Sequence, residues 1–232
     1  MHSLLNFWSS APHVNHECSH HDHGNRAENR FAQRLIREEL ADITADRGAK
    51  DVLHGQRHSD AADSKTRHER RDVDAVFAAV GKLPYADPQR TGIAGASYGG
   101  HMANWMQATT TRYKTLVSHA GLINLESQWG TSDTIYSREV NNGGPVWEQG
   151  PVWREQNPIR FAKNFRTPIL LSVGENDFRV PLNQTLENWS VLQRLRIPSR
   201  LIVWPDENHW ILKGENSRYW YQELHAWLKK YL

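Results

Sequence analysis

The six residues from Gly95 to Gly100 constrain the fold of this chain more than any other segment. They read Gly-Ala-Ser-Tyr-Gly-Gly, after a short apolar stretch at residues 91–94 and before a helix-like segment at residues 101–106. This pattern predicts a strand, a sharp turn and a helix, with Ser97 at the apex. The turn needs glycine on both flanks because side chains there would collide with the adjoining strand and helix. Such a turn lifts a serine hydroxyl out of a sheet, where a base can reach it.

The chain beyond residue 70 alternates strand and helix patterns. Continuous apolar runs predict strands at residues 93–94, 114–118, 168–173 and 199–204, and amphipathic or apolar segments predict helices at residues 72–80, 100–109, 182–194 and 217–232. This alternation is typical of a parallel sheet covered by helices on both faces, so we expect an α/β fold. The segment 129–157, rich in Gly, Pro and Trp, is expected to form a surface insertion beside a site.

The first 70 residues have a different character. Nine of the 13 His precede residue 70, whereas nine of the ten Trp follow it. One amphipathic helix is expected at about residues 27–45, and the remainder, including the highly charged run 54–71, is expected to be polar loop. We therefore predict two parts: residues 1–70, an atypical His-rich polar segment that is either poorly ordered or forms one helix, and residues 71–232, an α/β-hydrolase catalytic domain.

Composition narrows the function classes. A net charge of +2 gives no indication of a nucleic-acid partner, and no apolar run approaches the roughly 18 residues of a membrane span. The amino terminus lacks the basic and apolar regions of a signal peptide. Cys18 is the single cysteine, so no intrachain disulfide is expected. These features predict a cytoplasmic protein, and they leave the oligomeric state open.

A serine nucleophile requires a base and a carboxylate that orients it, and both follow later strands in this fold class. Asp177 follows the third predicted strand, where it is either the orienting acid or a helix N-cap, and Glu175 is the rival acid. His209 follows the fourth predicted strand. The order of Ser97, Asp177 and His209 along the chain predicts a catalytic triad.

Four separated motifs, at residues 87–100, 157–168, 174–181 and 205–210, resemble the catalytic domain of the prolyl oligopeptidase family of serine peptidases. The segments 208–217 and 143–147 are similar to its dipeptidyl-peptidase V and acylaminoacyl-peptidase branch. The resemblance covers about residues 72–232. It implies Ser97 as nucleophile, Asp177 as orienting acid, His209 as base and the Tyr98 backbone N–H as an oxyanion donor. It further places Tyr98, Val180 and Trp210 near the substrate pocket, and it implies no metal and no cofactor.

The chain also departs from the family pattern. Members carry a β-propeller, the first half of the hydrolase sheet and a His-Gly-Gly loop that contributes to the oxyanion hole. Residues 1–70 match none of these, and His54-Gly55 lacks both the second glycine and a preceding apolar strand. We expect only the later half of the sheet, from a truncated chain whose activity is impaired.

Two other signals are weaker. His16, Cys18, His20, His21 and His23 have side chains that bind transition metals, but no second pair of ligands follows at zinc-finger spacing. Three arginines, Arg154, Arg160 and Arg179, either meet a substrate carboxylate or are solvated or salt-bridged.

The sequence therefore predicts a serine hydrolase that cleaves peptide or ester bonds of short peptides or small acyl substrates through an acyl-enzyme. The alternatives are a small-molecule esterase and a weak or inactive remnant.

Overall fold

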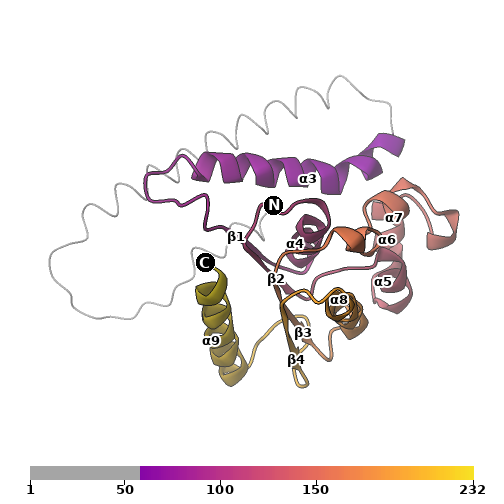
Figure 1. Cartoon of the computed structure of the whole chain (residues 1–232). Helices are drawn as coiled ribbons and strands as arrows, with labels where there is room; N and C mark the ends of the chain where they lie inside the picture. Colours follow the sequence, from indigo (N-terminus) through magenta and orange to yellow (C-terminus); the bar gives the residue numbers. More distant parts are fainter. Residues whose placement is uncertain (1–57) are drawn as a thin grey trace. The chain divides into compact units, whose positions relative to one another are not determined.

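The computed structural model describes residues 58–232. Residues 67–88 belong to one compact unit and residues 89–232 to a second. The first unit contains most of α3 (His58–Val80), which closes with the Gly81 N–H donating to the Phe77 carbonyl at 2.9 Å (Figure 1).

The prediction of a loop through residue 71 is wrong, because α3 begins at His58. The early part of this helix carries charges rather than an apolar stripe, so hydrophobic periodicity does not reveal it. Arg70 and Asp74, one turn apart, form an ion pair of 3.5 Å on its surface, and pairs at this spacing favour a helix without apolar periodicity.

The second unit is built on a four-stranded parallel sheet, which confirms the α/β prediction. Its strands are β1 (Gly92–Ala96), β2 (Thr115–His119), β3 (Ile169–Gly174) and β4 (Ser199–Trp204), and their order in space is their order in the chain. Every connection is therefore a crossover, and all four strands end at one edge of the sheet. The predicted strands differ from the observed ones by three residues at most.

Helices fill the crossovers and follow the last strand. They are α4 (Tyr98–Thr109), α5 (Leu125–Thr131), α6 (Ile135–Asn142), α7 (Pro151–Glu155), α8 (Leu182–Arg194) and α9 (Gly214–Tyr231), with 3-10 turns η2 (Val146–Glu148) and η3 (Pro158–Asn164). The predicted helix 182–194 is confirmed at both ends, α4 begins two residues before its predicted start, and α9 begins three residues before its own.

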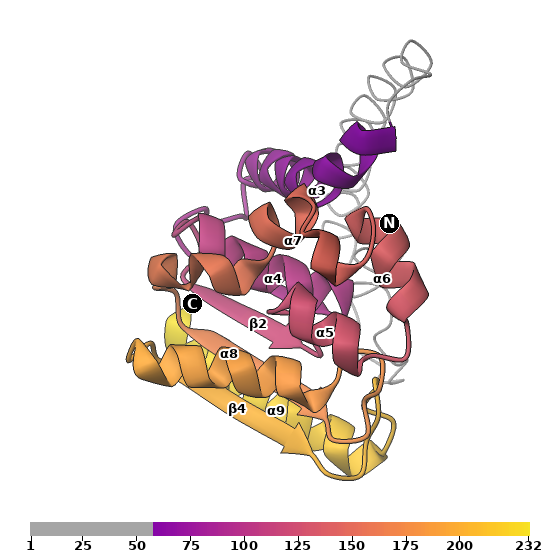
Figure 2. The ribbon, with the colours of Figure 1, turned by 90° about the vertical axis from the view of Figure 1, so that its right-hand side faces the viewer.

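The two faces of the sheet are covered by different helices (Figures 1 and 2). The α9 side chains Trp220, Leu224 and Trp227 pack against alternate residues of β2, β3 and β4, namely Val117, Leu170, Ile202 and Trp204. The Trp227 indole also donates to Thr115 Oγ1 at 2.7 Å. Helices α4 and α8 lie on the opposite face. The side chains at positions 115, 117 and 119 of β2 therefore all face α9.

The predicted insertion 129–157 lies mostly at the surface, and it is largely helical rather than a loop. It contains α6, η2, α7 and the end of α5. Trp153 is fully buried and its indole donates to the Gly144 carbonyl at 3.2 Å, whereas Tyr136 and Trp147 are largely exposed. The segment thus has its own anchor in the core and presents aromatic side chains outward.

No helix within residues 58–232 has both the length and the apolar character that a membrane crossing demands. The predicted helix at residues 27–45 and the His54-Gly55 pair lie outside the described residues.

Candidate active site

The Ser97 turn has the backbone geometry that its glycines predict. Ser97 directly precedes α4 and adopts φ 57° and ψ −117°, a strained combination for a residue with a side chain. A Cβ on Gly95 would lie 2.2 Å from the Gly99 carbonyl oxygen, and one on Gly100 would lie 2.7 Å from Gly121 Cα. The chain can therefore pass from strand to helix here only without side chains at these positions.

The turn is also tied to the neighbouring strand. The Ser97 N–H donates to the His119 carbonyl at the end of β2, at 2.9 Å. This N–H is thereby already paired, and the next N–H along the chain belongs to Tyr98, in the first turn of α4. The amino end of a helix carries partial positive charge, so a developing anion is favoured there.

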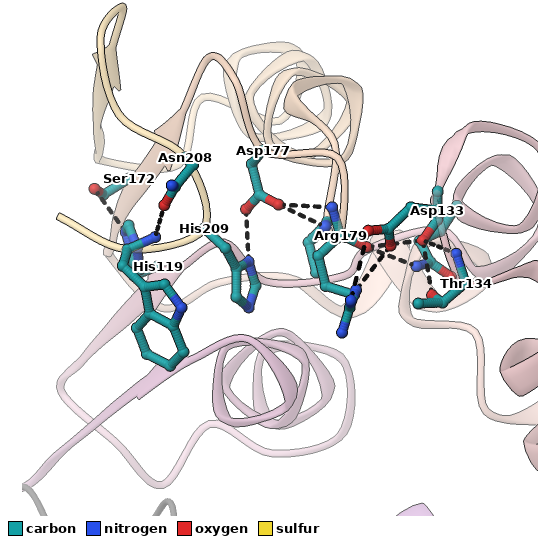
Figure 3. Close-up of polar contacts among 12 residues, drawn as sticks. His119, Asp133, Thr134, Ser172, Asp177, Arg179, Asn208 and His209 are labelled. Carbon is teal, nitrogen blue, oxygen red and sulfur yellow. Dashed lines mark hydrogen bonds and ion pairs between the residues drawn. The ribbon is translucent and has the colours of Figure 1, made fainter. Parts of the chain in front are cut away.

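Asp177 lies in the loop after β3 and its side chain is buried. Its Oδ1 accepts hydrogen bonds from the backbone N–H groups of Arg179 and Val180, both at 2.9 Å. These bonds fix the carboxylate so that Oδ2 points toward His209 (Figure 3).

His209 lies in the loop after β4, and its Nδ1 is 2.7 Å from Asp177 Oδ2. A carboxylate only accepts hydrogen bonds, so the proton of this pair resides on Nδ1 and leaves Nε2 as a base. The Trp210 ring stands edge-on to the imidazole, with 5.4 Å between ring centroids.

The structure brings Asp177 and His209 into direct contact and carries Ser97 on the same edge of the sheet. The Ser97 hydroxyl makes no hydrogen bond to the His209 ring in the described part of the chain. Catalytic hydrogen bonds of this kind often tighten only when substrate binds. Glu175, the rival acid, is exposed, and His209 pairs with Asp177 instead.

The three residues expected near the substrate pocket have different environments. Tyr98 is half-buried, with its ring 5.5 Å from that of His101. Val180 is fully buried among the apolar side chains Leu122, Leu125, Val152 and Trp153. Trp210 is 60% exposed beside His209, which leaves its surface open to a bound molecule.

Two of the three candidate arginines form ion pairs. Arg179 Nε lies 2.7 Å from Asp133 Oδ1 (Figure 3), and this hydrogen bond raises the pKa of Arg179 above its ordinary value. Arg160 pairs with Glu126, and Arg154 is exposed on α7. The salt-bridged alternative is thus the observed one for Arg160 and Arg179.

Among residues 58–232, no three His, Cys, Asp or Glu side chains gather as a metal site would require. The candidate ligands at residues 16–23 lie outside the described residues.

Sequence reasoning missed Glu207, which holds the loop that carries His209. Its buried carboxylate accepts from the N–H groups of Leu212 and Lys213, at 3.1 and 2.9 Å, and from Asn216 at 2.8 Å. Burial opposes ionisation of this group, but these hydrogen bonds outweigh it and lower the pKa of Glu207. An acidic residue in a loop gives no sequence signal of such a role.

His119, at the end of β2, was also missed. It is buried, and its Nδ1 lies 3.0 Å from Ser172 Oγ on β3. Burial lowers the pKa of His119 to about 4. A polar residue at the end of a predicted strand was the one available signal.

Comparison with known proteins places these features in a family. The model of the prolyl oligopeptidase family matches residues 52–232. Dipeptidyl-peptidase 5 of Porphyromonas gingivalis is 34% identical over 167 residues, which are 70% of this chain and 24% of that protein. Dipeptidyl-peptidase 5 of Schizosaccharomyces pombe is 35% identical over 151 residues, covering 64% of this chain and 22% of the relative.

A solved structure shares the fold. An acylaminoacyl peptidase of Pyrococcus horikoshii has a TM-score of 0.64 at 26% identity, over 69% of this chain and 27% of that one. The chain thus spans about a quarter of the length of the proteins that it resembles.

Proposed function

Because the chain belongs to the prolyl oligopeptidase family, we propose that it is a serine hydrolase in which Ser97, Asp177 and His209 form the catalytic triad. The observation that carries this proposal is the 2.7 Å contact between His209 Nδ1 and Asp177 Oδ2, at the sheet edge that also bears the strained Ser97 turn. The domain that performs the reaction corresponds to residues 71–232.

The reaction is acyl transfer to water. Ser97 Oγ attacks the carbonyl carbon of the substrate while its proton passes to His209 Nε2, and Asp177 stabilises the imidazolium. His209 then gives the proton to the leaving group, and an acyl-Ser97 ester remains. Water, activated by His209, hydrolyses this ester and restores the serine.

The oxyanion of each tetrahedral intermediate is stabilised by the Tyr98 N–H, because the Ser97 N–H is already bonded to His119. One such donor is worth on the order of a hundred- to a thousandfold in rate. Tyr98 and Trp210 line the substrate site, with Val180 as a buried support behind Asp177.

The relatives' names support a short peptide as the substrate. A small ester is the second substrate class that this triad serves, since the chemistry of acylation is the same.

Labelling of the full chain with a fluorophosphonate tests the triad, because this probe reacts only with an activated serine. We expect labelling at Ser97, no labelling of Ser97→Ala and at least a hundredfold slower labelling of His209→Ala. His225, exposed on α9, provides the matched control, and His225→Ala is expected to label normally. Equal labelling of another serine, or normal labelling of His209→Ala, would show that the triad is wrongly assigned.

A further inference from the structure

We propose that Gln128, on α5, and Ser132, at its end, are positioning residues for this triad: they hold the stretch of backbone whose N–H groups orient the Asp177 carboxylate. The inference rests on the proposed function, because it concerns how the same triad is aligned. It assigns no contact between either residue and the substrate.

Two successive peptide groups carry the link to the catalytic acid. The N–H groups of Arg179 and Val180 both donate to Asp177 Oδ1 at 2.9 Å, and Figure 3 shows Asp177 between His209 and this backbone. The carbonyls of the same two peptide groups belong to Phe178 and Arg179. No peptide bond in residues 58–232 is cis, so the C=O and N–H of each group point in opposite directions. Whatever binds these carbonyls therefore also fixes the N–H groups that bind the acid.

Three donors from one short segment bind these carbonyls. The Arg179 carbonyl accepts from Gln128 Nε2 at 3.1 Å and from Ser132 Oγ at 2.9 Å. The Phe178 carbonyl accepts from the Asp133 N–H at 2.9 Å. Each of the two peptide groups is thus held on both sides, by residues 128–133 at the carbonyl and by the catalytic acid at the N–H.

The two side chains reach the same carbonyl because they lie one helical turn apart. The Ser132 N–H donates to the Gln128 carbonyl at 3.0 Å and closes α5. Residues four apart on a helix share a face, so both side chains are directed to one place. Both are buried, and water therefore competes little for their bonds.

The hydrogen bonding of Gln128 shows which part of its amide is needed. Its Oε1 is buried and has no hydrogen-bond partner in the part of the chain that the structure describes. A buried acceptor without a partner destabilises a fold, and an apolar side chain of similar length would avoid this cost. The bond from Nε2 to the Arg179 carbonyl is therefore what the amide contributes here.

An ion pair joins the same two segments at the surface. Arg179 Nε lies 2.7 Å from Asp133 Oδ1, but the two side chains are 51% and 46% exposed. Solvent screens a pair of this kind, so it contributes little to holding the backbone. The two buried donors, rather than the ion pair, fix the Arg179 carbonyl.

Loss of both buried donors would leave the peptide group between Arg179 and Val180 free to turn. Asp177 would then lose its fixed direction toward His209, and the imidazole would lose its alignment with the serine. A displacement of about 1 Å in such a site can cost on the order of a hundredfold in rate. Acylation is therefore expected to slow while substrate affinity changes little.

Two substitutions of the full chain test the donors. Gln128→Met and Ser132→Ala each remove one donor and keep most of the side-chain shape, and the double variant removes both. We expect fluorophosphonate labelling of Ser97 to slow about threefold in each single variant and at least about tenfold in the double variant. For a hydrolysed ester, kcat falls and KM stays the same in the double variant.

Gln107→Met is the matched control. Gln107 is a buried glutamine on α4 whose Nε2 donates to the Thr167 carbonyl at 2.7 Å and whose Oε1 accepts the Thr167 N–H at 3.2 Å. Thr167 precedes β3 and Asp177 follows it, so this control lies at the opposite edge of the sheet. We expect it to lower stability without slowing labelling. A purely structural role for Gln128 predicts that Gln128→Met labels as fast as Gln107→Met, and that outcome would overturn the proposal.

Amide hydrogen exchange at Arg179 and Val180, resolved by NMR, gives a readout that does not depend on activity. We expect at least threefold faster exchange at these two amides in the double variant than in Gln107→Met. If wild type is not labelled but this exchange pattern appears, the proposed function fails and the positioning role stands. If wild type is labelled and the double variant matches Gln107→Met in exchange or in labelling rate, the positioning role fails even though the triad is correct.

Discussion

Acidification from pH 7 to pH 5 is expected to destabilise the folded chain through His119. The imidazole has a pKa of about 4 in the folded protein, chiefly because it is buried, against 6.5 when it is exposed. Between these values the unfolded chain binds a proton that the folded chain does not. Stability attributable to this group is therefore present above pH 6.5 and is lost as the pH falls toward 4.

The size of the effect follows from the same two values. Each pH unit between them is worth about 1.4 kcal/mol, so His119 removes about 2 kcal/mol of the unfolding free energy by pH 5. The full difference, about 3.4 kcal/mol, is reached only below pH 4. The unfolding free energy of a small protein falls by roughly 2 kcal/mol per molar urea, so a loss of about 2 kcal/mol lowers the urea midpoint of unfolding by about 1 M.

Urea unfolding of wild type and His119→Phe at pH 7, 6 and 5 measures this contribution. The other histidines are common to both proteins, so the difference between their pH slopes isolates His119. We expect wild type to lose about 2 kcal/mol more than His119→Phe between pH 7 and pH 5. Equal slopes would show that His119 is protonated in the folded state, which would refute the buried neutral ring.

Three further outcomes are expected. Gly100→Ala should lower the unfolding free energy by about 3 kcal/mol, because its Cβ would lie 2.7 Å from Gly121 Cα. Gly130→Ala should leave it unchanged, because a Cβ there would meet nothing within 4 Å. Equal melting curves for the two variants would contradict this expectation. Glu207→Gln should lower the unfolding free energy by about 2 kcal/mol above pH 5, where the native carboxylate is ionised and hydrogen-bonded. The difference from wild type should shrink at lower pH, because acid then protonates Glu207 in the wild type. Urea unfolding at several pH values measures both the loss and its pH dependence. The kcat/KM for a nitrophenyl ester should be about a hundredfold higher than that for the matching amide, because Tyr98 is the one backbone oxyanion donor that we assign within residues 58–232. A kcat/KM near 10⁴ M⁻¹s⁻¹ for the amide would contradict this expectation.

Much of the fold was predictable because its two central strands, β2 and β3, are buried along their whole length. Residues 168–173 and 199–204 are nearly continuous apolar runs, and the strands observed there agree to within a residue. Helix Leu182–Arg194 was predictable at both ends, since proline precedes it and its polar and apolar residues alternate with helical period. The pairing of Asp177 with His209 was predictable from topology, because parallel strands deliver their following loops to one edge.

Other elements depend on contacts that a linear pattern does not show. Helix α5 begins where the Asn124 side chain accepts from the N–H groups of Glu126 and Ser127, and α6 ends at Gly143 in the left-handed region. Both are too short to show a period. The environment of His119 exists only because the register sets it beside Ser172, and a slip by one residue would turn it to the other face.

Backbone contacts position the loop that carries His209. A Cβ on Gly174 would lie 2.1 Å from the Asn208 carbonyl oxygen, so the His209 loop passes directly over the end of β3. The Asn176 N–H donates to the Glu207 carbonyl at 3.0 Å, which joins this loop to the one that carries Asp177. Glu207 holds the far side of the His209 loop through its carboxylate. The imidazole therefore needs only one bond of its own, to Asp177, and Nε2 remains available for the proton of Ser97.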